Sequence, residues 1–186
     1  EHSGAGADEV AQFAGEGRGV ERVVGQHQQP VTLAAGQDEE IRVGRARLVN
    51  PDICFCTNFG PNHMDMHKTI ENLIWAKSSV VAGLQEDGIC IVNREIQFYD
   101  QLVDDIKKRR SSVPIYLYGD RPGVDARLLE SSFDTEKFGW NITADIDGEK
   151  IYYFIPYFQG YAPLASVGIL LLVKKLGYDV QKAALD

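Results

Sequence analysis

The sequence predicts an α/β fold, a three-layer arrangement around a parallel sheet to which a β-hairpin is added. Two patterns lead to this prediction. Between residues 51 and 118, short apolar runs alternate with longer stretches whose apolar residues recur at helical spacing, as in βαβ units. Beyond residue 139 the pattern becomes strict alternation on both sides of Asp147-Gly148, a dipeptide that favours a tight hairpin turn.

The first five elements are predicted from their own local patterns. The first helix has an apolar stripe that includes Leu73, Ile74 and Val81, and the second places Phe98, Leu102 and Ile106 at steps of four. The βαβαβ order implies right-handed crossovers. The expected elements are strand 51–58, helix 68–84, strand 89–93, helix 96–110 and strand 114–118.

The remaining elements follow the change of period. The alternating segments 140–146 and 150–155 form the expected hairpin. An apolar helix is expected over 162–176, with Gly177 closing it. A further helix is expected to begin near Tyr178-Asp179-Val180.

Composition divides the chain near residue 50. The first fifty residues contain one aromatic residue, Phe13, whereas the rest contain seven Phe, eight Tyr and two Trp. We therefore expect residues 1–46 to be a weakly ordered or divergent segment and residues 47–186 to form the domain.

Composition also excludes several classes of function. The net charge of −8 argues against a nucleic-acid-binding surface. The longest apolar run, 167–173, is too short to span a membrane, and the polar N-terminal stretch does not resemble a signal peptide. The three cysteines, Cys54, Cys56 and Cys90, lie in apolar runs, which favours packed thiols in a reducing compartment; the cytoplasm is the expected location. A zinc pair formed by Cys54 and Cys56 on one face of a strand is the alternative.

The richest polar segment follows the first expected strand. It reads Thr57-Asn58-Phe59-Gly60-Pro61-Asn62-His63-Met64-Asp65, and Lys77 follows fourteen residues after the histidine. In open α/β sheets, ligands bind at the carboxyl ends of the strands. A histidine at this edge can ligate a divalent metal or make hydrogen bonds within its loop. We interpret Asp65 as the cap of the following helix.

Lys77 and Asn93 each allow two interpretations. Lys77 is a snorkelling lysine at the edge of the core or a functional cation. Asn93 is a turn residue at a strand end or a ligand-binding amide. His63 and His67 have a zinc-like spacing, but no third ligand is evident nearby. The basic run 107–110 complements the end of a helix dipole.

In this order the residues resemble the second half of the central, ATP-binding domain of the Mur ligase family. The resemblance covers about residues 47–186 and is carried by Thr57-Asn58, His63-Met64-Asp65, Lys77, the run Gly88–Asn93, Tyr118-Gly119 with Asp125-Ala126, and Phe154-Ile155-Pro156 through Gly177.

The resemblance implies an ATP-dependent ligase that joins a carboxylate, through an acyl phosphate, to an amine. It implies ATP and Mg²⁺ as cofactors and small-molecule acids and amines as substrates. By the same resemblance, His63 and a carbamylated Lys77 are the expected catalytic residues and magnesium ligands, and Asn58 and Asn93 are expected to bind the nucleotide. Carbamylation requires a neutral amine, hence partial burial of Lys77.

The sequence also departs from the family pattern. The phosphate-binding G-x-x-x-x-G-K-[ST] loop has no match in these residues, and Gln159-Gly160 replace the His-Asn pair that precedes the family's last helix. The family's carboxy-terminal domain is also unmatched, so we expect a partial domain that works with the missing domains of a larger enzyme. The alternative is a non-catalytic binding or scaffold module descended from the same fold.

Overall fold

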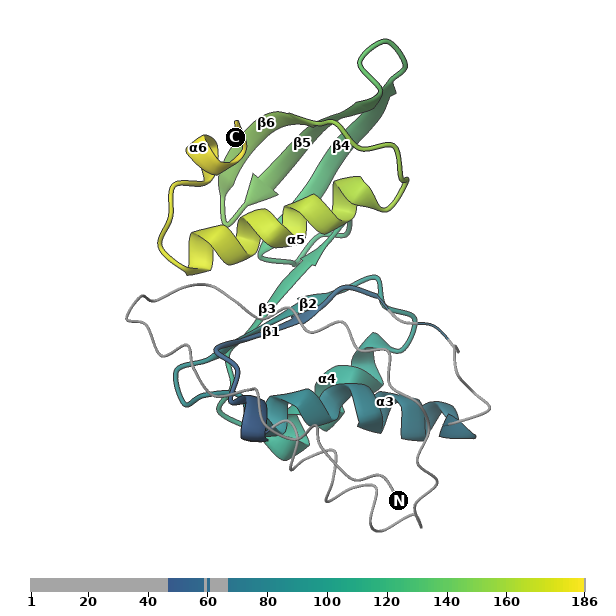
Figure 1. Cartoon of the computed structure of the whole chain (residues 1–186), viewed down its shortest axis with the longest axis vertical. Coiled ribbons are helices and arrows are strands. Elements are labelled where there is room, and N and C mark those ends of the chain that lie inside the picture. The colour runs from purple at the N-terminus through teal and green to yellow at the C-terminus, as the bar shows by residue number, and fades with distance from the viewer. Residues whose placement is uncertain (1–46, 59, 61–66, 186) are drawn as a thin grey trace, which may run out of the picture. The chain divides into compact units, whose positions relative to one another are not determined.

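The structure, a computed structural model, describes residues 47–58, 60 and 67–185 (Figure 1). These residues contain a single sheet of six strands with helices on both faces. None of the helices in the described ranges is long and apolar enough to cross a membrane. The elements, in chain order, are β1 (Ile53–Cys56), α3 (Ile70–Ser78), the 3₁₀ helix η1 (Ser79–Gly83), β2 (Ile89–Asn93), α4 (Tyr99–Arg109), β3 (Ile115–Gly119), β4 (Ala126–Asp134), β5 (Gly139–Ile146), β6 (Glu149–Ile155), α5 (Ala162–Lys175) and α6 (Val180–Ala183).

The strands lie in the sheet in sequence order, from β1 to β6. The pairs β1–β2, β2–β3 and β3–β4 are parallel, and β4–β5 and β5–β6 are antiparallel. The α/β prediction and the βαβαβ order of the first half are therefore confirmed.

Strand β4 was not expected from the sequence. Its register with β5 shifts between Leu128 and Glu130, which marks a bulge. A bulge inserts one extra residue and interrupts the two-residue alternation of side chains. Periodicity alone therefore could not identify this strand.

Two hydrophobic cores flank the sheet, because successive residues of a strand point to opposite faces. On β2, Ile91 belongs to the core beneath α5, whereas Cys90 and Val92 belong to the core beneath α3 and α4. All three side chains are fully buried. The helices on the two faces make the three layers that the sequence predicts.

The first helix is shorter than expected and starts with a different cap. The hydroxyl of Thr69 accepts a hydrogen bond from the backbone N–H of Asn72, so Thr69 caps α3. Asp65, which we interpreted as this cap, lies outside the described residues. At the other end, the hydroxyls of Ser78 and Ser79 donate to the carbonyls of Trp75 and Ala76. Such back-bonding competes with the helical pattern, and the chain continues as the 3₁₀ helix η1.

The hairpin between β5 and β6 confirms its prediction. Asp147 and Gly148 have φ values of 56° and 83°, as a type I′ turn requires. Lys174 and Lys175, in the last turn of α5, pair with Glu149 and Asp147 at 2.6 and 2.8 Å. These ion pairs connect the turn to the helix that covers it.

Close packing of α5 on the sheet depends on Gly168. A Cβ atom at this position would lie 2.8 Å from Phe55 and 2.9 Å from Tyr118, whose rings pack against each other. We expect Gly168→Val to lower the free energy of unfolding by about 2 kcal/mol or more, because both rings would have to move. Ile169→Val, at the exposed neighbouring position, should change it by less than about 0.5 kcal/mol. Urea denaturation followed by circular dichroism measures both; a stable Gly168→Val variant would contradict this packing.

Candidate active site at the carboxyl ends of the parallel strands

Strands β1, β2 and β3 end at the same edge of the sheet, and a buried amide connects two of these ends. Asn93, the last residue of β2, donates from Nδ2 to the carbonyl oxygen of Thr57 at 2.6 Å. Its Oδ1 accepts the backbone N–H of Glu95 at 2.8 Å. Because the side chain is only 6% exposed, these bonds satisfy a group that would be costly to bury alone.

Tyr118 reaches the same carbonyl from the third strand. Its hydroxyl lies 3.4 Å from the Thr57 carbonyl oxygen and 3.5 Å from that of Cys56. Burial raises the pKa of the Tyr118 hydroxyl, and the neighbouring Cys56 raises it further. Tyr118 therefore keeps its proton and can act as a donor to the end of β1.

Glu95 is a functional candidate that the sequence did not single out. Its Oε2 pairs with Nε of Arg121 at 2.8 Å, while its Oε1 is buried without a hydrogen-bond partner among the described residues. Gly119, at the end of β3, lies beside it, and a Cβ atom there would come within 2.7 Å of this oxygen. A free carboxylate oxygen suits a hard cation or a polar hydrogen of a ligand. The signal available in the sequence was its position, two residues after Asn93 at the carboxyl end of β2.

Lys77 lies in the last turn of α3 and is exposed. It is nevertheless close enough to the carboxyl end of β1 to act on Cys56. Hydrogen bonds from Cys54 and Cys90 hold the pKa of the Cys56 thiol well below its usual range, and the positive charge of Lys77 adds to this effect against the opposing influence of burial. The expected partial burial of Lys77 is not seen, so the described residues do not supply the desolvation that would favour its carbamylation.

The structure brings together only part of the predicted site. Thr57 and Asn58 are exposed at the end of β1, and Asn93 lies beside them. His63 and Asp65 lie outside the described residues, so the expected proximity of His63 and Lys77 stays a prediction. Both ends of the Asn93 amide already make hydrogen bonds within the protein, which favours the interpretation of Asn93 as a turn residue at a strand end.

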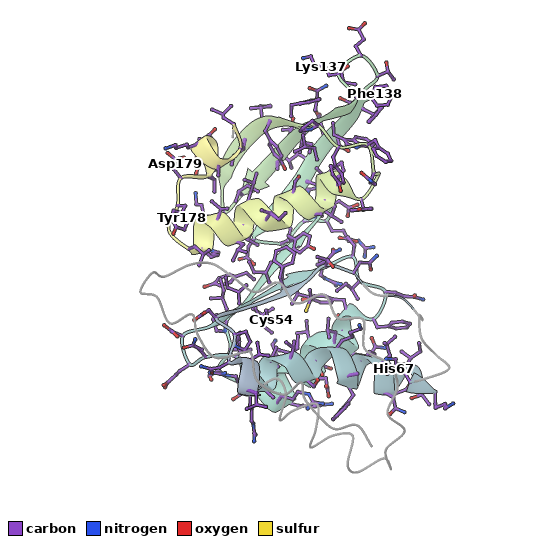
Figure 2. All side chains as sticks on the ribbon, in the orientation of Figure 1. Cys54, His67, Lys137, Phe138, Tyr178 and Asp179 are labelled. Atoms are coloured by element: carbon purple, nitrogen blue, oxygen red, sulfur yellow. The ribbon has the colours of Figure 1, made fainter. Side chains whose placement is uncertain are left out.

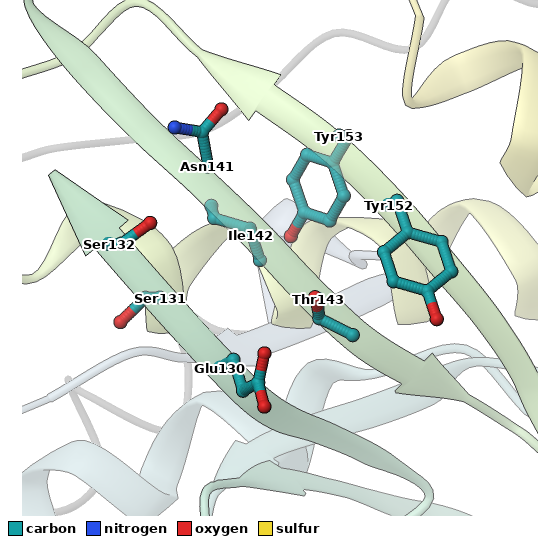
Figure 3. Close-up of a pocket in the computed structure, with 8 residues that line it drawn as sticks. All are labelled: Glu130, Ser131, Ser132, Asn141, Ile142, Thr143, Tyr152 and Tyr153. Atoms are coloured by element: carbon teal, nitrogen blue, oxygen red, sulfur yellow. The ribbon is translucent and has the colours of Figure 1, made fainter. Parts of the chain in front are cut away.

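A depression of about 570 Å³ lies elsewhere, over the antiparallel strands. Figure 3 shows the polar side chains of Glu130, Thr143 and Tyr152 across β4, β5 and β6. These three residues are register partners. No histidine, cysteine or lysine lines this depression, so we place the candidate site at the strand ends.

Comparisons with known proteins find likeness in both sequence and fold. Residues 32–158 match the family model for the Mur ligase middle domain, a match that starts upstream of the expected boundary at residue 47. UDP-N-acetylmuramoylalanine–D-glutamate ligase from Clostridium beijerinckii is 36% identical over 56 residues, which are 30% of this chain and 12% of that protein.

Solved structures extend the likeness to the fold. MurF from Acinetobacter baumannii superposes with a TM-score of 0.64 at 16% identity, covering 77% of this chain and 30% of that protein. MurF from Thermotoga maritima in complex with ADP has a TM-score of 0.62 at 16% identity, with 76% and 32% covered. The chain thus spans about a third or less of the length of these relatives.

The bridging amide predicts a large stability effect. Asn93→Ala should lower the free energy of unfolding by about 2–4 kcal/mol, at about 1–3 kcal/mol for each hydrogen bond that is lost. The Glu95 N–H loses its side-chain acceptor, and the Thr57 carbonyl keeps only the longer contact to the Tyr118 hydroxyl. Asn58→Ala, on the exposed end of β1, should have an effect below about 0.5 kcal/mol. Chemical denaturation gives both values, and faster amide exchange at Glu95 in Asn93→Ala would locate the loss. Equal stabilities of the two variants would refute the bridging role.

Proposed function

Because the chain belongs to the Mur ligase family through its middle domain, we propose that it contributes the nucleotide-binding edge of an ATP-dependent ligase. The reaction joins the carboxylate of a small-molecule acid to an amine, with an acyl phosphate as the activated acid. The observation that carries this proposal is the arrangement at the carboxyl ends of β1, β2 and β3, where Asn93 holds the strand ends together beside the unpaired oxygen of Glu95.

The residues at this edge fit ATP carried with Mg²⁺. Magnesium prefers oxygen ligands and keeps several waters, and the buried Oε1 of Glu95 is an oxygen without a hydrogen-bond partner among the described residues. We assign Glu95, His63 and Lys77 to the metal and phosphate side of the site. Lys77 would act as a cation, or as a carbamate formed when its neutral amine adds to CO₂ and loses one proton. When bound, ATP and Mg²⁺ supply the phosphoryl group and the charge that neutralises it.

The two asparagines have different proposed roles. Asn58 is exposed at the end of β1 and is free to contact the nucleotide. Asn93 is a positioning residue, because both ends of its amide already make hydrogen bonds within the protein. We therefore expect substitution of Asn93 to affect binding through the shape of the edge.

The second candidate is a binding or scaffold module on the same fold. It is favoured by the exposure of Lys77 and by the lack of a phosphate-binding loop in these 186 residues. Both candidates predict weak nucleotide binding by this chain alone. They differ in the activity expected of a longer reading frame: the ligase would release ADP in the presence of an acid and an amine, and the binding module would not.

For the 186-residue chain, we expect Mg–ATP to bind with a dissociation constant above about 100 μM. Two lost charge-assisted hydrogen bonds, at about 1.5 kcal/mol each, raise the dissociation constant of a micromolar site by about 100-fold. Isothermal titration calorimetry measures the affinity. Micromolar binding would show that other residues replace the loop.

The ligase proposal itself is tested on the longest reading frame that contains this chain. We expect release of ADP that requires both an acid and an amine, with Lys77→Ala and Glu95→Gln each reducing the rate by about 100-fold or more, the scale on which a lost electrostatic contact to the reacting groups acts. Lys107→Ala, an exposed lysine on α4, is the matched control and should retain activity. ATP binding without ADP release under any acid and amine pair would support the binding module.

A further inference from the structure

All three cysteines of the chain meet in the layer between the sheet and the helices α3 and α4. Cys54 and Cys56 are two residues apart on β1 and therefore share a face. Cys90 is the register partner of Cys54 on the adjacent parallel strand β2. The three sulfur atoms lie within 4.8 Å of one another, and those of Cys54 and Cys56 are 3.9 Å apart. Figure 2 shows Cys54 between the strands and this pair of helices.

From this geometry we propose that Cys54, Cys56 and Cys90 form a three-thiolate site for one soft d¹⁰ cation, Zn²⁺ or Cu⁺, that links β1 to β2. This goes beyond the proposed ligase activity and does not depend on it. On binding, each thiol gives its proton to solvent and its sulfur becomes a ligand.

The distances suit such an ion. Two sulfur atoms bound to one tetrahedral Zn²⁺ at about 2.3 Å lie about 3.8 Å apart, and about 4.0 Å apart in a planar three-coordinate site. The pair formed by Cys54 and Cys56, at 3.9 Å, already has this separation. The third sulfur, within 4.8 Å, needs to move by less than about 1 Å to complete the set.

The ligand set and its apolar surroundings favour a soft cation. The thiols are packed among Ile74, Val81, Leu84 and Val92, and no carboxylate or imidazole of the described residues joins the group. A site with only sulfur ligands favours Zn²⁺ and Cu⁺ over Mg²⁺ or Ca²⁺. Cys54 and Cys90 are buried, while Cys56 is half-buried, so an ion can enter from the side of Cys56.

The net charge of a zinc-filled site would be small. Three thiolates and Zn²⁺ leave one net negative charge in an apolar layer. The ammonium group of Lys77 acts on Cys56 from the surface and offsets part of that charge.

The test uses the reduced, metal-free chain titrated with Zn²⁺, with Cd²⁺ as an optical probe and with Cu⁺ under anaerobic conditions. We expect one equivalent to bind, with a thiolate-to-cadmium charge-transfer band and a higher thermal midpoint in the presence of Zn²⁺. Mg²⁺ should give neither effect. Cys56→Ala should lower the Zn²⁺ affinity by more than about 100-fold, since even an outer partner of a metal ligand contributes about 10–100-fold.

Two controls separate this site from other sources of binding. Val92 is buried on the same face of β2 as Cys90. Val92→Ala should therefore destabilise the fold but keep the one-equivalent binding and its optical band. The triple Ala variant of the cysteines keeps the four histidines and should lose both signals. Unchanged Zn²⁺ binding in that variant, or the absence of a band and of any thermal shift in the unsubstituted chain, would overturn the proposal.

Discussion

Strand β2 is covered by helices on both faces, and its last residue, Asn93, carries an amide into that buried environment. Cys90, Ile91 and Val92 can be buried on apolar grounds alone, but the amide must find partners in the protein. It finds them in the Thr57 carbonyl and the Glu95 N–H. The end of β1 and the first turn after β2 are thereby fixed together. The candidate site is a consequence of this arrangement, because Asn58 and Glu95 lie on the two segments that the amide connects.

The two halves of the sheet differ in how their faces are covered. The parallel half, β1 to β3, is enclosed between helices, so its strands are apolar and its polar chemistry is restricted to the strand ends. The antiparallel half, β4 to β6, packs one face against α5 and leaves the other partly exposed, where Glu130, Thr143 and Tyr152 are found. The change from parallel to antiparallel pairing occurs at β4, which begins beside the end of β3 at Tyr118. This separates the candidate site at the strand ends from the open polar surface of the antiparallel half.

The sequence was sufficient for the elements whose periodicity is regular. The βαβαβ order followed from apolar runs and helical spacing, and the hairpin followed from Asp147-Gly148. Strand β4 could not be found in this way because its bulge breaks the alternation. The cap at Thr69 was missed because several polar residues precede the helix and only the backbone geometry selects among them.

For the candidate site, the sequence identified residues on individual strands but could not show which residues of different strands come into contact. The family resemblance singled out Asn58 and Asn93, yet the use of the Asn93 amide depends on a carbonyl 36 residues away. Oε1 of Glu95, which has no hydrogen-bond partner within residues 47–58, 60 and 67–185, has room only because Gly119 on the next strand lacks a side chain. Cys54 and Cys56 could be placed on one face, but the addition of Cys90 required the register between β1 and β2.

The same distance along the chain has a consequence for folding kinetics. The β5–β6 hairpin closes across a two-residue turn, and isolated hairpins form within about 1–10 μs. The contact between Asn93 and Thr57 must close a much longer loop, and each doubling of loop length costs about 0.6 kcal/mol of entropy. We therefore expect the hairpin to form early in folding and the ends of β1 and β2 to join later, so that the edge that carries the candidate site would be assembled after the hairpin.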